Sequence, residues 1–429
     1  MLARYAYYFF KLRRNLHLQP SALRAVQNKR TRAIVHHAYE QVPFYHRKFD
    51  EARIKPDEIK SAEDLCRLPM TTKTELQATP LDEVVANTFD VKDCLKKATS
   101  GSTGVPLTIV VDKRAEDLRG AMWARAYAEN GLGFTDKLAT IRDPRDFVNG
   151  GWLRRLRGCR RTDISIFDSP EQQAKLLETF RPDVIKGYVS SLAILADFYR
   201  QKERGFSPHH VFTGAELLLD TDRKRIGSAF GCDVLDYYGS TEFSLLGWEC
   251  ESHTGYHINA DGNAIELVSD GEVVSTGERG EIVCTGLTNY AMPLIRYQIG
   301  DSGISIKEPC PCGRSLPLLK MLQGRTGDFL VTVDGRLIPP TAFSPYPFGS
   351  LEGIRQFRII QEARDRIVIQ LVFEKGFLGV DRVLNRARGE IQRVFGKGIE
   401  VEFQLLDKLD KDQTGKLRKI VSHVPPIWR

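Results

Sequence analysis

A cluster of hydroxyl-bearing residues and glycines between positions 98 and 106 has residue types that suit phosphate binding. It reads Ala-Thr-Ser-Gly-Ser-Thr-Gly-Val-Pro. Glycines let a backbone turn tightly, and the successive N–H groups of such a turn can surround an anion. The cluster lacks the Gly-Lys-Ser/Thr ending of a P-loop, so on its own it indicates either a phosphate site or an ordinary turn.

Four further segments follow this loop along the chain and favour the phosphate interpretation. They are Asp236–Glu242, Arg296–Asp301, Gly324–Asp328 and Thr414–Lys416. In this order the five segments resemble the adenylate-forming enzyme superfamily.

Three shorter strings narrow the resemblance. They are Val42–Tyr45, Leu68–Lys73 and Pro309–Arg314, the last reading Pro-Cys-Pro-Cys-Gly-Arg. They are similar to phenylacetate-CoA ligase, and the closest likeness is to the members associated with capsular polysaccharide biosynthesis. The resemblance extends from about residue 25 to 420.

The resemblance implies an α/β fold with two domains. A large N-terminal domain, residues 1–325, would hold mainly parallel sheets and a β-subdomain. A small, mobile α+β domain, residues 326–429, would carry the catalytic lysine and rotate between two half-reactions. Gly327 stands where the superfamily often has an acidic residue, and glycine would widen the freedom of a hinge there.

The resemblance also implies a reaction. ATP and a carboxylic acid, aryl or acyl, would form an acyl-adenylate with release of pyrophosphate, and the acyl group would pass to coenzyme A. Transfer to an amine or hydroxyl in polysaccharide or secondary-metabolite synthesis is an alternative, because the sequence shows no coenzyme A contact and Val105 replaces a lysine frequent in phenylacetate-CoA ligases. A third alternative is a zinc-stapled scaffold that binds nucleotide without catalysis. The residues Lys416, Glu242, Asp301 and Arg325 argue against it, because a protein that does not catalyse a reaction has no physical need for that set.

Roles follow residue by residue from the resemblance. Glu242 would bind magnesium, a hard cation that prefers carboxylate oxygen. Lys416 would stabilise the pentavalent phosphorus, and Arg325 would bridge ribose and phosphate. These three form the expected catalytic set. The remaining nucleotide-binding residues are Thr99, Ser100, Gly101, Ser102, Thr103 and Gly104 for the phosphates, Gly214, Ala215, Glu216, Tyr237 and Tyr238 for adenine, Asp301 for the ribose, and Gly239, Ser240 and Thr241 beside them.

Two cysteines in the Pro309–Arg314 string indicate a second kind of site. Cys310 and Cys312 lie on a turn shaped by proline and glycine, and Cys250 precedes them with His253 and His257 close by. Three thiolates and one imidazole satisfy tetrahedral zinc, and a closed site of this kind clips loops together without doing chemistry. His257 is preferred to His253 as the fourth ligand, but the spacing leaves the choice open.

Composition fits a cytoplasmic enzyme. The chain has 429 residues with a net charge of +7 and 42% hydrophobic residues, enough for two cores. The mild charge argues against a nucleic-acid partner. No uncharged apolar run is long enough to span a membrane, and the aromatic and basic residues 5–14 are expected to pack on the protein rather than lie in a membrane surface. Oligomeric state is not indicated.

Periodicity places these residues on expected elements. Helices are expected over Ser21–Gln41 and Glu116–Asn130. Strand-like runs end near Gly187, Gly214 and Tyr237 with helical stretches between them, which favours a parallel sheet with ligands at the carboxyl ends of its strands. Residues 271–297 resemble short strands of a β-subdomain. The last hundred residues indicate strands around 358–360, 367–369 and 400–403 and a helix over 381–395.

Overall fold

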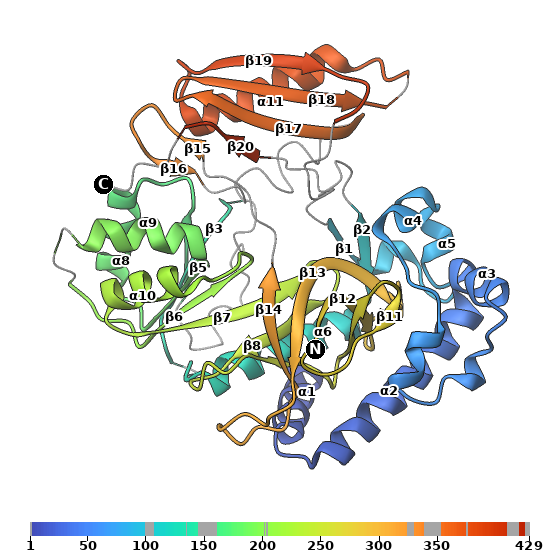
Figure 1. Ribbon diagram of the computed structural model, residues 1–429. Helices are drawn as coiled ribbons and strands as arrows, with labels where there is room; N and C mark the ends of the chain where they lie inside the picture. Colours follow the sequence, from blue (N-terminus) through green and yellow to red (C-terminus); the bar gives the residue numbers. More distant parts are fainter. Residues whose placement is uncertain are drawn as a thin grey trace. The chain divides into compact units, whose positions relative to one another are not determined.

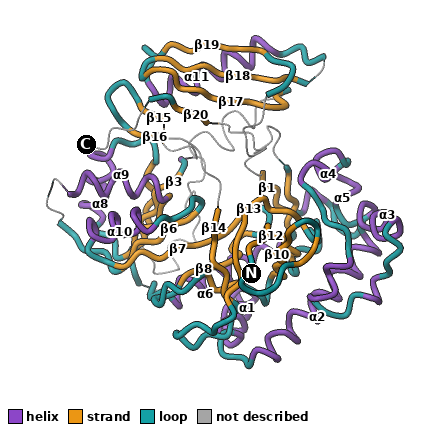
Figure 2. The backbone as a smooth tube through the Cα atoms, in the orientation of Figure 1, coloured by secondary structure: helices purple, strands orange, loops and turns teal. Residues whose placement is uncertain are grey.

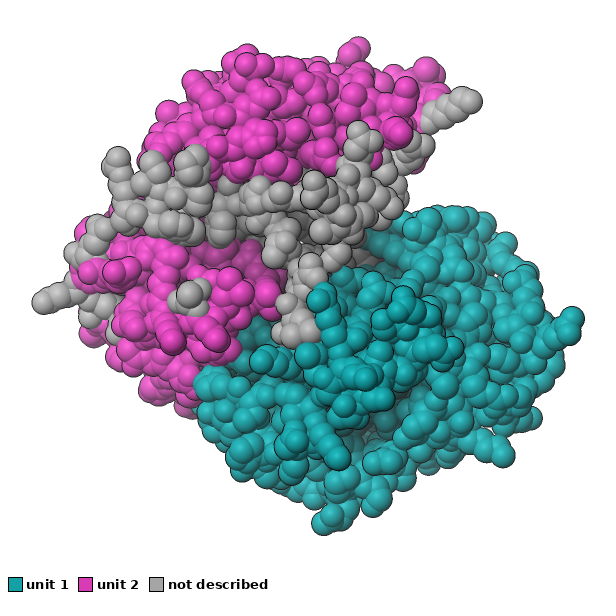
Figure 3. Space-filling view, in the orientation of Figure 1, with its two compact units in different colours: residues 1–97, 108–133, 235–325 teal, residues 98–107, 134–234, 326–429 magenta. Residues whose placement is uncertain are grey.

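A computed structural model gives the structure of residues 2–98, 107–133, 135–144, 161–200, 202, 205–323, 330–338, 353–374, 376–409 and 420–424. The chain forms two compact units, coloured separately in Figure 3. Unit 1 comprises residues 1–97, 108–133 and 235–325, and unit 2 comprises residues 98–107, 134–234 and 326–429.

The helices of unit 1 begin where the sequence supplies helix-starting residues. Helix α2 (Pro20–Gln41) has proline in its first turn, and the Asp112 carboxylate caps α6 (Lys113–Glu129) by accepting hydrogen bonds from the Arg114 and Ala115 amides. Both helices match the ranges expected from periodicity. The other helices of this unit are α1 (Leu2–Asn15), α3 (Pro43–Glu51), α4 (Lys73–Ala78), α5 (Leu81–Val84) and the short η1 (Pro56–Glu58), η2 (Glu63–Arg67) and η3 (Val91–Asp93).

Helix α1 packs against α6, as Figure 1 shows. Leu12 of α1 is buried in one cluster with Leu118 and Met122 of α6, and the Tyr5 hydroxyl donates to the Gly120 carbonyl. The aromatic N-terminal segment therefore packs on the protein, as expected, although Tyr7 and Phe10 stay exposed.

The large sheet of unit 1 is antiparallel throughout. Its strand order is β11-β10-β12-β13-β14-β9-β8-β7. The strands are β7 (Asp233–Ser240), β8 (Ser244–Glu249), β9 (Tyr256–Ile258), β10 (Asn263–Ser269), β11 (Glu272–Val273), β12 (Arg279–Gly286), β13 (Tyr297–Ile306) and β14 (Leu318–Gln323). Strands β1 (Leu95–Ala98) and β2 (Thr108–Val111) pair separately. The β-subdomain expected over 271–297 corresponds to part of this sheet.

Residues 134–234 of unit 2 contain a set of parallel strands. Their order is β6-β5-β3-β4, and the chain alternates between strand and helix as the sequence predicts. The expected α/β class is confirmed, with parallel pairs both here and in the C-terminal sheet and with the large sheet of unit 1 antiparallel. The elements are β3 (Leu138–Arg142), β4 (Arg161–Ser165), α8 (Pro170–Phe180), β5 (Val184–Tyr188), α9 (Val189–Arg200), β6 (His210–Gly214) and α10 (Asp220–Phe230).

The C-terminal part of unit 2 is a small α+β layer, visible in Figures 1 and 2. Its sheet has the order β19-β18-β17-β20. Helix α11 (Val380–Phe395) buries Val383, Ala387 and Ile391, which recur every four residues on one face. Its strands are β17 (Ile354–Ala363), β18 (Arg366–Phe373), β19 (Glu400–Leu405) and β20 (Ile420–Ser422), and β15 (Leu330–Val331) and β16 (Leu337–Ile338) form a separate pair.

Among the described residues, no helix combines the length and apolar character that crossing a membrane requires.

Candidate functional site

The hairpin between β7 and β8 carries the segment Asp236–Glu242 and sets its geometry. Ser240 pairs with Ser244 at the end of the hairpin, and residues 241–243 form the turn. Gly239 lies at a register shift, where an added Cβ would come 2.3 Å from the Ser244 carbonyl oxygen. Only glycine fits such a close approach of two backbones. The local need for glycine thus fixes the turn that presents Glu242.

Glu242, the expected magnesium ligand, is held from two sides inside unit 1. Glu242 is 3% exposed. The Tyr297 hydroxyl donates a hydrogen bond to its Oε1 at 3.1 Å, and Arg119 Nη2 donates to its main-chain carbonyl at 2.5 Å. One contact orients the carboxylate and the other fixes the backbone.

Asp301, the expected ribose ligand, lies on β13 and accepts a hydrogen bond from the Tyr238 hydroxyl at 3.0 Å. Gly300 precedes it with a φ of +87°, a left-handed conformation that favours glycine. The structure therefore joins two separate sequence segments, one with Tyr238 and one with Asp301.

The two expected adenine-stacking tyrosines differ in environment. Tyr237 is buried, with its ring centroid 5.6 Å from that of Trp123 and 5.4 Å from that of Tyr127. Asn130 donates to its hydroxyl at 3.0 Å, and burial holds the pKa of Tyr237 well above its usual value. Tyr238 is more exposed. Of the two, Tyr238 is therefore the better placed to offer a ring face to a base.

Gly214, Ala215 and Glu216 lie in unit 2 at the carboxyl end of β6. Ala215 has a φ of +66°, an uncommon conformation for a residue with a side chain. The Glu216 carboxylate accepts hydrogen bonds from the Ser190 amide at 2.7 Å and the Ser190 hydroxyl at 2.9 Å, in the first turn of α9. Burial raises the pKa of Glu216. These contacts fix the turn after β6 to the start of α9.

The predicted zinc ligands come together within unit 1. The ligand atoms of Cys250, His257, Cys310 and Cys312 all lie within 4.8 Å of one another. Cys250 Sγ is 3.5 Å from Cys310 Sγ, and His257 Nε2 is 3.3 Å from both Cys250 Sγ and Cys312 Sγ. Ligand atoms of a tetrahedral zinc ion lie roughly 3.3–3.8 Å apart. His253 is not part of this group and instead faces Glu249, with Nδ1 3.8 Å from the carboxylate.

Local structure brings these four ligands together. His257 lies on β9, which pairs with β8 on one side and β14 on the other. The Gly313 amide donates to the Cys310 carbonyl at 3.1 Å and closes the turn that carries both Cys310 and Cys312. Gly313 has a φ of +79°. The short strand β9 and the turn that ends at Gly313 thus position three of the four ligands.

Burial shifts the pKa values of two members of the cluster in opposite directions. It raises the pKa of the Cys250 thiol to about 12 and lowers the pKa of His257 to about 4, with the Arg314 guanidinium as a further cause for the histidine. A neutral imidazole keeps a lone pair for a metal, and a metal would deprotonate the thiols on binding. The residues present therefore suit zinc in number, chemistry and spacing.

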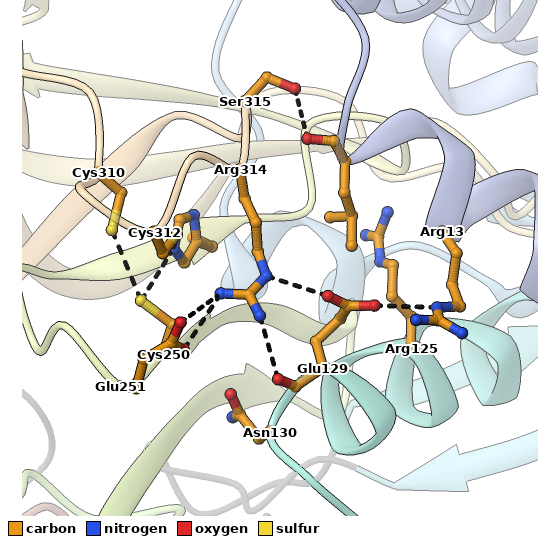
Figure 4. Close-up of polar contacts among 12 residues, drawn as sticks. Arg13, Arg125, Glu129, Asn130, Cys250, Glu251, Cys310, Cys312, Arg314 and Ser315 are labelled. Atoms are coloured by element: carbon orange, nitrogen blue, oxygen red, sulfur yellow. Dashed lines mark hydrogen bonds and ion pairs between the residues drawn. The ribbon is translucent and has the colours of Figure 1, made fainter.

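Arg314, which follows the cysteine turn, ties the cluster to α6 (Figure 4). Its Nε lies 3.1 Å from the Glu129 carboxylate, its Nη2 donates to the Glu129 carbonyl at 3.1 Å, and its Nη1 contacts Glu251 at 3.2 Å. The guanidinium also lies over the Trp248 ring, 5.5 Å from the centroid. The end of α6 is thereby joined to the turn that carries Cys312.

Several predicted residues lie outside the described part of the chain. They are Thr99, Ser100, Gly101, Ser102, Thr103, Gly104, Arg325, Gly327 and Lys416. Two residues of the site were not assigned a role from the sequence. Arg119 lies within α6 and in no motif. Tyr297 lies inside the Arg296–Asp301 motif, and this position was the only signal for it.

Comparisons with known proteins bear on this site. The sequence profile of the CapK C-terminal domain matches residues 330–423. A phenylacetate-coenzyme A ligase from Thermus thermophilus is 29% identical, over 93% of this chain and 96% of the length of that ligase. The Escherichia coli phenylacetate-coenzyme A ligase is 31% identical, with 72% of each chain covered. A crystal structure of 2-hydroxyisobutyryl-CoA ligase with 2-HIB-AMP and CoA aligns with a TM-score of 0.66 at 22% identity, over 95% of this chain and 91% of that chain.

The fold and these likenesses define the class, AMP-forming acid–coenzyme A ligases. Within that class, the chain belongs to the phenylacetate-coenzyme A ligase family.

Proposed function

We propose that this protein uses ATP to convert a carboxylic acid into an acyl-adenylate, releases pyrophosphate, and then transfers the acyl group to coenzyme A. The observation that carries the proposal is the arrangement around the β7–β8 hairpin, where a buried Glu242 is oriented by Tyr297 and Asp301 is held by Tyr238. A magnesium ligand and a ribose ligand are needed together in a site that positions ATP for attack. Family membership supports the same reaction.

The described residues divide the work of binding ATP. Glu242 would bind the magnesium ion that neutralises phosphate charge, and Asp301 would accept hydrogen bonds from the ribose hydroxyls. Tyr238 would border the adenine, and we assign Gly214, Ala215 and Glu216 to adenine binding from their sequence context alone. We assign phosphate binding to residues 99–104, and charge stabilisation during adenylation to Arg325 and Lys416, from their sequence context. ATP and coenzyme A are cytoplasmic metabolites, which supports a cytoplasmic location.

The cluster of Cys250, His257, Cys310 and Cys312 would hold one structural zinc ion. Four protein ligands fill a tetrahedral shell and leave no position for a reacting water. The ion would join the turn after β8, strand β9 and the turn before β14. The assignment to structure rather than catalysis follows from the closed ligand set.

A second acceptor class has one supporting observation. The C-terminal residues 330–423 match the CapK domain family, and a capsule-related role would favour an amine or hydroxyl as acyl acceptor over coenzyme A. The first half-reaction is the same in both cases. The acceptor, and the identity of the acid, then distinguish the two functions.

The experiment is a panel of aryl and short-chain carboxylic acids incubated with the purified protein, MgATP and coenzyme A, with AMP and acyl-CoA measured by chromatography. We expect AMP and a thioester in equal amounts for at least one acid. If AMP forms without a thioester, and an added amino or hydroxyl compound is acylated in an amount equal to the AMP, the acceptor belongs to the second class and is not coenzyme A. No acid-dependent AMP with any acceptor would contradict the proposed function.

A further inference from the structure

Arg119 has a buried guanidinium that is only partly satisfied. The residue lies in the middle of α6 and is 5% exposed. Its Nη2 donates to the Glu242 carbonyl at 2.5 Å. Its Nε and Nη1 are buried, and among the described residues neither has a hydrogen-bond partner.

The charge of this side chain also lacks a direct counterion. No carboxylate of the described residues lies within ion-pair distance of Arg119, although Asp112, Glu116 and Glu242 are near enough to influence it electrostatically. Burial lowers the pKa of Arg119, yet an arginine stays protonated at neutral pH. The site therefore keeps a positive charge and two unused donors in the protein interior.

Arg125, six residues further along the same helix, has the carboxylate partner that a buried arginine usually has. It is fully buried, and its Nε has no hydrogen-bond partner among the described residues, but its Nη1 lies 2.7 Å from the Asp261 carboxylate, and its Nη2 donates to Asn259 and Asp261. A buried donor without a partner destabilises the folded state, and more so when it is charged. The two arginines differ in their counterion, because Arg125 pairs with Asp261 and Arg119 pairs with no carboxylate of the described residues, so the charge of Arg119 is the one left to be neutralised.

We propose that Nε and Nη1 of Arg119 bind an anionic oxygen of the reactants of adenylation. The inference rests on the proposed function and extends it to a residue without a place in any of its sequence motifs. Two features locate the ligand. The bond to the Glu242 carbonyl fixes the guanidinium beside the residue proposed to bind magnesium, and guanidinium donors match carboxylate and phosphate oxygens. The anion is either the carboxylate of the acid or a phosphate of ATP, which offer the same chemistry.

The same bond gives Arg119 a second effect. An anion at Nε or Nη1 would bind the same guanidinium whose Nη2 donates to the Glu242 carbonyl. Anion binding and the position of the magnesium ligand would thus be linked through one guanidinium. A lysine, with a single charged nitrogen, can retain the charge but not both contacts.

The experiment compares Arg119→Gln and Arg119→Lys with the wild type by isothermal titration calorimetry. MgATP, AMP and sodium phenylacetate are the probes. Arg114→Gln is the matched control, because Arg114 is an exposed arginine in the first turn of the same helix. Circular dichroism and melting temperature report whether each variant is folded.

We expect Arg119→Gln to weaken binding of MgATP or of phenylacetate about tenfold or more, since hydrogen bonds to charged groups contribute about 1.5–3 kcal/mol. Arg119→Lys should lose less and Arg114→Gln nothing. Weaker MgATP binding with AMP unchanged identifies the β- or γ-phosphate, loss for both nucleotides identifies the α-phosphate, and loss for phenylacetate alone identifies the acid.

The inference is overturned if folded Arg119→Gln binds all probes like the wild type, or if neither Arg119 variant folds, which would make the residue structural. Wild-type protein that binds no MgATP would instead contradict the proposed function itself. The two failures are therefore distinguishable.

Discussion

At the scale of single residues, Tyr297 is a positioning residue for the proposed magnesium ligand. Its hydroxyl is the side-chain donor to Glu242 Oε1, and both residues are buried. Without this bond the carboxylate would sample other orientations before it binds a metal ion. The aromatic ring can stay where it is when only the hydroxyl is removed.

We therefore expect Tyr297→Phe to raise the magnesium concentration for half-maximal adenylation about fivefold, because a hydrogen bond contributes about 1 kcal/mol. The measurement is acid-dependent pyrophosphate exchange over a magnesium titration. Tyr39→Phe, which removes a hydroxyl donating to Asp50 on the helical surface, is the control. An unchanged magnesium requirement in the Tyr297 variant would remove this role.

Lys186 on β5 is expected to make the free energy of unfolding rise with pH. Burial, with the Arg142 and Arg161 guanidiniums as further causes, lowers the pKa of Lys186 to about 7. Between that value and the pKa of about 10.4 in an unfolded chain, the unfolded state binds a proton that the native state lacks. Raising the pH through this window should therefore stabilise the native state.

Lys186→Met removes the titrating group, so its melting temperature should exceed that of the wild type by a few degrees near pH 7 and by less near pH 9.5. Differential scanning fluorimetry across this range checks the result. Lys175→Met, at an exposed position on α8, should show no such trend. A difference that is constant with pH, or that grows as the pH rises, would contradict the assignment.

Residue types and spacing were sufficient to predict the cysteine and histidine cluster but not Arg119. Thiols on a turn signal a metal from local sequence alone, and the preferred His257 is the histidine that joins the group. Arg119 and Tyr297 act through contacts with Glu242 that span more than fifty residues of sequence. Such contacts depend on the packing of α6 and β13, which no local pattern records.

At the scale of elements, the cluster of Cys250, His257, Cys310 and Cys312 brings together the turn after β8, strand β9 and the turn before β14. Strand β9 has three residues, and β14 pairs with it at only two positions, Leu318 with His257 and Leu319 with Tyr256. Arg314 then ties the cysteine turn to α6. Zinc would stabilise this corner of unit 1 by adding a cross-link that the hydrogen bonds do not supply.

We expect the purified protein to carry about one zinc ion per chain, and Cys310→Ser with Cys312→Ser to lose the metal and lower the melting temperature. Inductively coupled plasma mass spectrometry and thermal denaturation measure the two effects. Cys66→Ser with Cys94→Ser is the control, because both thiols lie outside the cluster. Metal-free wild type after reducing, chelator-free purification would contradict the zinc assignment.

Elements with a regular pattern were predictable, and their pairing was not. Periodicity located α2, α6 and α11 to within a few residues, because one apolar face of each helix is buried. The strand-helix alternation correctly indicated the parallel strands of unit 2. The antiparallel order of unit 1 brings β14 between β13 and β9, an arrangement set by long-range pairing rather than by any single strand's composition.

At the scale of the whole molecule, the division at residue 325 stays a prediction. The compact units are discontinuous in sequence, and unit 2 combines residues 134–234 with residues 326–429. The match of residues 330–423 to a C-terminal domain family supports a separate C-terminal module. We propose that this module brings Lys416 to the reactants for adenylation. Adenylation would then depend on the C-terminal module through this one lysine.

The measurement that tests the account most directly is acid-dependent exchange of labelled pyrophosphate into ATP by wild type, Lys416→Ala and Lys411→Ala. We expect exchange in the wild type with at least one acid, a loss of about 100-fold or more in Lys416→Ala with ATP binding little changed, and normal exchange in Lys411→Ala, since Lys416 acts only on the transition state. Equal exchange in wild type and Lys416→Ala, or no exchange with any acid, would contradict the account.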